Sequence, residues 1–202
     1  MYILYGRKGV LNRVIDTKTW LVEWYSDSEL DNRIASGYFD ELVGSRNDVL
    51  SMDKLNSVLM HLNQKGLFPF SFKFSNDGYL CLSRYFGDST TVNIPFNDII
   101  IEDSCFEGSN LQEVILHNVK RIGSRAFANC INLRSVLIPS GVEKIGRSAF
   151  EGCTSLESVV YESKSEIPAE MFKNCIRLAR FVSPNLSVNF DDFAFSSTRL
   201  VK

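Results

Sequence analysis

The chain has 202 residues, and 45% of them are hydrophobic, a proportion at which a globular core can form. Charged residues make up 23% and the formal net charge is -2, so nucleic acid and anionic membrane surfaces are disfavoured as partners. The five cysteines, an odd number without a CxxC pair, fit neither a complete disulfide framework nor a zinc knuckle.

The amino-terminal segment lacks the pattern of a secretory signal. From Met1 to Lys8 the basic residues follow the apolar ones, and no apolar h-region comes after them. No apolar run in the chain approaches the length of a membrane span, so we expect no membrane insertion. Because this pattern is missing, we expect a cytoplasmic location. A cell-surface location is the alternative if the native amino terminus is longer.

Residues 1–74 lack any repeat and predict a small α+β unit. Short strands are expected over Tyr2 to Tyr5, Val10 to Ile15 and Trp20 to Tyr25, with polar turns between them. A helix is expected over Met52 to Lys65, where apolar residues form one stripe and the polar face carries no catalytic constellation. No known family is recognised in this part of the chain.

A β-hairpin is predicted where the repeats begin. Phenylalanines alternate with other residues from Phe68 to Phe74, and Asn76-Asp77-Gly78 then turns the chain into a second apolar run that starts at Tyr79. We expect this hairpin to pack the helix onto the first rung of the following domain and to serve as its amino-terminal cap.

Residues 75–202 are built from a repeated block. The segment Ile122–Cys130 recurs as Ile145–Cys153, and a Leu-x-x-Val pattern follows each copy. Weaker copies extend in both directions, with a repeat length of about 22 residues, which falls within the leucine-rich range. One phenylalanine column fixes the register of the copies: Phe106, Phe127, Phe150, Phe172 and Phe195.

This pattern resembles the BspA-like (Treponema-type) leucine-rich repeats, whose signature is an I-G-x-x-A-F-x-x-C block followed by L-x-x-V-x-I-P. The resemblance covers about residues 75–202 and implies a right-handed solenoid with short parallel strands and helical turns. It also implies kinship with bacterial or protist surface proteins, some of which adhere to host matrix proteins or to other cells. An adhesin of bacterial origin is therefore the alternative function.

Each coil of such a solenoid cannot bury its apolar face alone, so stacking supplies the core. Alternation sends Val136 and Ile138 inward, with Leu133 packing below them, and Pro139 then ends the strand. The stretch Ser124–Asn129 is expected to form a helical turn whose phenylalanine fills the coil.

One column of thiols invites a chemical interpretation. Cys130, Cys153 and Cys175 should stack at roughly 5 Å, the spacing of neighbouring strands. A metal or redox ladder is one hypothesis. We favour reduced thiols that act as small buried hydrophobes, because free cysteine is among the most buried residue types.

Catalysis is not expected from this sequence. His61 and His117 lie beside no nucleophile or carboxylate pair, and a pair of His117 with a repeat cysteine is rejected because a catalytic thiol needs a polar, exposed setting. An enzyme in the amino-terminal unit would need a polar pocket near His61, Asp16 or Glu23. We predict no catalytic residue, no cofactor and no metal ligand.

The best candidate site is the outer face of the repeat strands. Alternation turns four apolar residues outward beside four mostly polar ones, and soluble monomers seldom leave a large apolar patch uncovered. We predict a non-enzymatic protein-interaction module whose partner is another protein, a second copy docking through this face or a solenoid end, or the amino-terminal unit. The competing interpretation is that β-branched residues simply suit a strand surface. The predicted partner-binding residues are Glu113, Ile115, Ser135, Leu137, Ser158, Val160, Arg180 and Val182.

Overall fold

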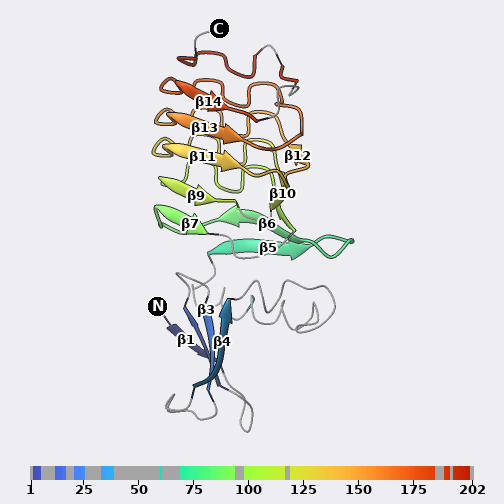
Figure 1. Cartoon of the computed structure of the whole chain (residues 1–202), viewed down its shortest axis with the longest axis vertical. Helices are drawn as coiled ribbons and strands as arrows, with labels where there is room; N and C mark the ends of the chain where they lie inside the picture. The colour runs from blue at the N-terminus through green and yellow to red at the C-terminus, as the bar shows by residue number, and fades with distance from the viewer. Residues whose placement is uncertain are drawn as a thin grey trace. The chain divides into compact units, whose positions relative to one another are not determined.

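The chain divides into two compact units in the computed structural model (Figure 1). The first comprises Met1–Phe68 with Pro95–Asn97, and the second comprises Pro69–Ile94 with Asp98–Lys202. This division lies before the boundary expected after residue 74, because the predicted hairpin pairs with the repeats. The structure describes residues 2–5, 12–16, 21–25, 33–38, 60, 69–93, 98–116, 119–184, 189–191 and 193–200, and only backbone positions in those up to 38.

The first unit contains a four-stranded antiparallel sheet in the order β1-β2-β3-β4. The strands are β1 (Tyr2–Tyr5), β2 (Asn12–Asp16), β3 (Leu21–Tyr25) and β4 (Arg33–Tyr38). The first three confirm the predicted strands. The fourth was not predicted, because its sequence Arg-Ile-Ala-Ser-Gly-Tyr shows no clear alternation of apolar and polar residues.

The predicted α+β cap is not supported by the described residues, which show a sheet in this unit. The helix expected over Met52 to Lys65 lies outside the described residues except at Met60, which is helical and exposed. His61 and His117 also lie outside them, as do the side chains of Asp16 and Glu23.

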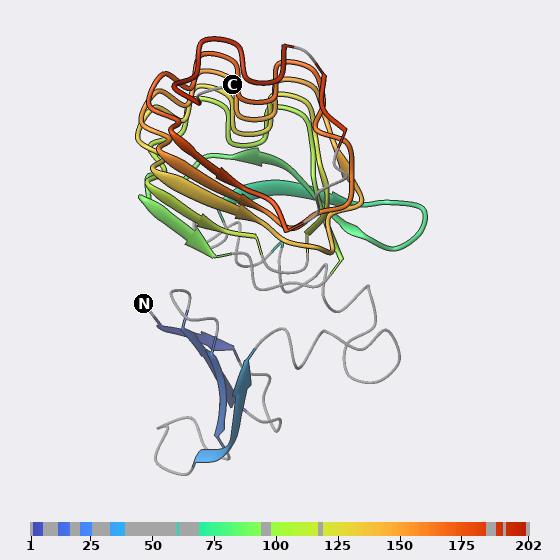
Figure 2. The ribbon, with the colours of Figure 1, turned by 45° about the horizontal axis from the view of Figure 1, so that its top comes forward.

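The second unit is a stack of coils with strands on two sides (Figure 2). Strands of successive coils pair in parallel, and among the described strands of this unit the antiparallel pair is the first hairpin. One sheet has the order β12-β10-β8-β6-β5, made of Lys144–Ile145, Val119–Ile122, Ile99–Ile101, Leu80–Tyr85 and Phe70–Phe74. The other side holds β7 (Thr91–Asn93) paired with β9 (Glu113–Ile115), and then β11 (Ser135–Ile138), β13 (Ser158–Tyr161) and β14 (Arg180–Val182).

The hairpin β5–β6 forms the first layer of this stack. Its turn is at Asn76-Asp77-Gly78, where Gly78 has φ 81°, a backbone conformation that glycine adopts without steric cost. Strand β6 pairs in parallel with β8, and the buried Phe70 ring lies 5.6 Å from the Phe106 ring. The predicted hairpin is therefore confirmed.

The core of the solenoid follows the predicted columns. Leu133, Val136 and Ile138 are buried, and β11 ends before Pro139 as expected. The phenylalanine column is a continuous stack, with ring centroids 4.9, 5.0, 5.8 and 5.5 Å apart from Phe106 to Phe195. Contacts between aromatic rings stabilise a fold beyond the effect of burying their apolar area. These contacts join each of the five coils that carry the phenylalanines to the next.

The predicted helical turns are wrong, because the stretch Ser124–Asn129 forms a series of turns instead. Arg125 and Asn129 have φ values of 56° and 59°, which a right-handed helix cannot accommodate. Their N–H groups, with that of Phe127, donate to carbonyls of the next coil at 2.7–3.0 Å rather than within their own turn. The backbone of the turns thus forms a ladder between coils.

The Ile-Gly pair of the repeat is explained by close approach of neighbouring backbones. A Cβ atom on Gly123 would lie 2.4 Å from the Asp103 nitrogen, and one on Gly146 would lie 2.3 Å from the Ser124 nitrogen. A side chain at either position would force the coils apart.

Candidate partner-binding surface

The eight predicted residues lie together on one side of the solenoid, which we call the strand face. In the three-stranded sheet, Leu137 is in register with Val160 and then Val182. Strand β9, which carries Glu113 and Ile115, lies beside β11 (Figure 1). The strand face therefore consists of Glu113, Ile115, Ser135, Leu137, Ser158, Val160, Arg180 and Val182.

The apolar row of this face is partly open to solvent. Leu137 is 45% exposed and Val182 is 40% exposed, while Ile115 and Val160 are half-buried. The neighbouring strand residues Val136, Ile138, Val159 and Tyr161 are buried, as two-residue alternation requires. The structure thus brings the predicted residues into rows, and whether they bind a partner stays a prediction.

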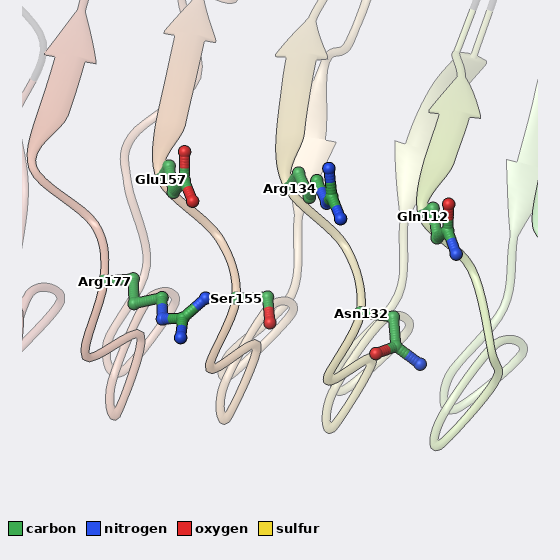
Figure 3. Close-up of a pocket in the computed structure, with 6 residues that line it drawn as sticks. All are labelled: Gln112, Asn132, Arg134, Ser155, Glu157 and Arg177. Atoms are coloured by element: carbon green, nitrogen blue, oxygen red, sulfur yellow. The ribbon is translucent and has the colours of Figure 1, made fainter.

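A polar cavity of about 270 Å³ lies at the amino-terminal ends of these strands (Figure 3). Gln112, Arg134 and Glu157 immediately precede β9, β11 and β13, and the other lining residues lie in the loops below, where Arg177 extends toward Ser155. The lining residues are Gln112, Asn132, Arg134, Ser155, Glu157 and Arg177.

Sequence reasoning missed this cavity, although a signal for it exists. Its residues flank the buried leucine column Leu111, Leu133, Leu156 and Leu178, one position before or after each leucine. A column of buried residues places its sequence neighbours in adjacent columns. Polar residues in the columns on both sides of the leucines therefore indicate a polar surface running across the coils.

The turns on another side of the solenoid carry ion pairs that join coils. The Arg125 guanidinium lies 2.6 Å from a Glu107 oxygen and 2.9 Å from a Glu151 oxygen, and Arg147 lies 3.0 Å from Glu170. The hydrogen bond from Arg125 lowers the pKa of Glu107. These charged side chains of the turns thus pair with one another within the chain.

The thiol column has a structural explanation. The Sγ atoms of Cys130, Cys153 and Cys175 each donate to the carbonyl oxygen of a phenylalanine in the preceding coil, at 3.1 Å in every case. Hydrogen bonding with its cysteine neighbours, followed by burial, raises the pKa of Cys153. The same contact with Cys153 lowers the pKa of Cys130. All three thiols are buried and each has a backbone partner, whereas a catalytic thiol lies in a polar, exposed setting.

The described residues contain no group of three or more metal-ligating side chains placed to hold an ion. In the same part of the chain, no helix has the length and apolar character needed to span a bilayer.

Stacked coils with parallel strands, a buried leucine column and intervening turns define a leucine-rich-repeat solenoid. Six copies of the BspA type leucine rich repeat region match residues 84–202, more than half of the chain. The chain therefore belongs to the BspA-type leucine-rich-repeat family, as the resemblance predicted. Proteins of this repeat class are generally protein-interaction modules and are typically non-enzymatic. No curated protein matches the chain.

Solved structures of similar proteins come from bacteria. A leucine rich cell surface protein from Faecalibacterium prausnitzii is 21% identical with a TM-score of 0.44, and the match covers 57% of this chain and 38% of that one. A Treponema pallidum leucine rich repeat protein is 18% identical with a TM-score of 0.42, over 66% of this chain and 88% of its own. The match thus spans well under half of the first protein. The cytoplasmic location expected for this chain stays a prediction.

Proposed function

We propose that the chain is a non-enzymatic protein-interaction module that binds a partner protein through the strand face. The observation that carries the proposal is the register of Leu137, Val160 and Val182, which places an apolar row with partly exposed ends on adjacent strands. A row of this kind becomes more stable when a partner covers it, because burial of apolar surface is favourable.

Polar residues support the same use of this face. Ser135 and Ser158 are in register with each other and then with Arg180, two residues before the apolar row on the same strands. Interfaces combine an apolar centre with a polar rim that fixes orientation, and these two rows have that composition. A partner protein of extended or flat shape fits such a surface.

The experiment is affinity capture from the native host, followed by calorimetric titration of the purified partner. The double variant Leu137→Ser, Val160→Ser should weaken binding at least tenfold, since each substitution removes apolar area from the interface. The control is Phe86→Ser, which alters an apolar side chain outside the strand face that is 54% exposed, more than Leu137 at 45%. Equal affinity of the folded double variant and the wild type would refute the proposal.

Self-association is tested with the same variants. If the partner is a second copy of the chain, sedimentation velocity should show a concentration-dependent dimer in the wild type and in Phe86→Ser, and a monomer in the double variant.

A further inference from the structure

The arginines of the polar cavity differ from those of the turns. Arg125 and Arg147 pair with carboxylates of neighbouring coils. Arg134 and Arg177, in contrast, make no ion pair or hydrogen bond through their guanidinium groups with any described residue. Both arginines are exposed, and both line the cavity. Their donors are therefore free for a ligand.

The charge of the lining favours a ligand with a single negative charge. Two arginines and one glutamate, Glu157, give the cavity a net charge of +1, and Gln112, Asn132 and Ser155 add neutral polar groups. Guanidinium groups match carboxylates in geometry and bind them through charge-assisted hydrogen bonds. A dianionic phosphate would be repelled more strongly by Glu157, and no aromatic ring among the lining residues offers a stacking surface for a sugar or a base.

The surroundings of the cavity are those of a protein-binding surface. The cavity lies at the starts of the strands that carry the apolar row, and Leu137 is three residues along the chain from Arg134. Ile131 and Ile176, each the residue before a lining residue, are 54% and 52% exposed. A ligand in the cavity is thus flanked by apolar side chains that a peptide can cover.

We propose that this cavity is a carboxylate subsite, which takes an Asp or Glu side chain of a protein segment whose aliphatic residues cover the apolar row. The inference rests on the proposed function for the apolar contacts, while the arginine contacts are independent of it. The partner segment is therefore acidic and aliphatic in composition.

The test uses a phage library of random dodecapeptides selected on the whole chain. Selected peptides should be enriched in Asp or Glu beside Leu, Ile or Val, and a labelled selected peptide should bind the wild type in a fluorescence anisotropy titration. Replacing its acid by the amide should weaken binding roughly tenfold, because charge-assisted hydrogen bonds are lost. Raising the salt concentration should also weaken it.

Variants of the chain separate the two proposals. The double variant Arg134→Gln, Arg177→Gln should lower the affinity for the acidic peptide to that for its amide form. The control is Arg121→Gln, which changes an exposed arginine on β10 in the other sheet and should leave the affinity unchanged. Glu157→Gln should strengthen binding, because it removes the one negative charge of the lining.

Failure of the inference has a distinct signature. It is overturned if the selection returns no binding peptide or only peptides without acids, or if the arginine double variant binds as the wild type does. If Leu137→Ser leaves acidic-peptide binding unchanged while the arginine variant abolishes it, the carboxylate subsite stands and the proposed use of the apolar row fails.

Discussion

Removal of one ring from the phenylalanine column should destabilise the whole solenoid. Phe150 is fully buried and stacks on Phe127 at 5.0 Å and on Phe172 at 5.8 Å. Burial of a phenylalanine side chain removes roughly 150–250 Å² of its surface from water. At about 25 cal/mol per Å², this burial contributes ~4–6 kcal/mol to the free energy of unfolding. Measured Phe→Ala substitutions in cores cost about 3–5 kcal/mol. We therefore expect Phe150→Ala to lower the free energy of unfolding by about 3–5 kcal/mol.

The assay is urea unfolding followed by far-UV circular dichroism, with the midpoint and the slope fitted separately. The matched control is Phe193→Ala, which removes a ring that is 66% exposed and should change the free energy of unfolding by no more than about 0.5 kcal/mol. If Phe150→Ala does not fold, Phe150→Leu keeps much of the volume and should cost roughly 1–2 kcal/mol. A loss below about 1 kcal/mol in folded Phe150→Ala would refute the role of the column.

Three further predictions concern the backbone, the ion pairs and the thiols. Gly146→Ala should cost roughly 1–3 kcal/mol in urea unfolding, while Gly141→Ala, whose Cβ would meet nothing within 4 Å, should cost little. Because the pKa of Glu107 is lowered from 4.5, its pairing stabilises the fold above pH 4.5 and is lost as pH falls through the lowered value. Arg125→Gln should reduce that acid-side loss by less than about 1 kcal/mol, and an unchanged pH profile would contradict the pairing. Burial raises the pKa of Cys105 to about 12, so iodoacetamide should label it slowly in the folded chain and rapidly in urea, as followed by mass spectrometry.

The columns of the solenoid could be predicted from the sequence because burial imposes a repeated residue type. A coil can stack only if its inward positions are apolar and of matching size, so Phe127 and Leu133 recur at a fixed spacing. The strand alternation of Val136 and Ile138 follows from the two-residue period of a strand in the same way. These features carry their signal in the residue identities themselves.

The form of the turns could not be predicted in this way. A short segment such as Ser124–Asn129 has the composition of a helical turn, and the structure differs because backbone N–H groups donate to the next coil. This ladder exists only when coils are stacked, so it is a tertiary effect that local propensity does not contain. The left-handed positions leave a partial signal, since the one occupied by Asn129 is glycine in two other copies, at 108 and 152.

The candidate surface was likewise predictable from the sequence only in part. The apolar row was predictable because Leu137 and Val160 lie between buried residues of the same strands. The cavity depends on which polar side chains of neighbouring coils turn toward one another and which find partners. Such pairing is set by side-chain conformation and not by residue type, so the sequence placed Arg134 and Arg177 next to the leucine column without showing that they are unpaired.

Stacking of the coils allows the residue type to vary at only some positions of each coil. This restricts the surfaces at which the chain can bind a partner. The buried columns are fixed by packing, and at the turns charged residues such as Glu107 and Arg125 complement one another between coils. Groups satisfied within the chain have little to gain from a partner, because a partner must first break the existing pairs. Leu137 and Arg134 are exposed instead, and no ion pair holds the arginine in the described part of the chain. Free energy from new contacts is therefore available at the strand face and its cavity rather than at the turns.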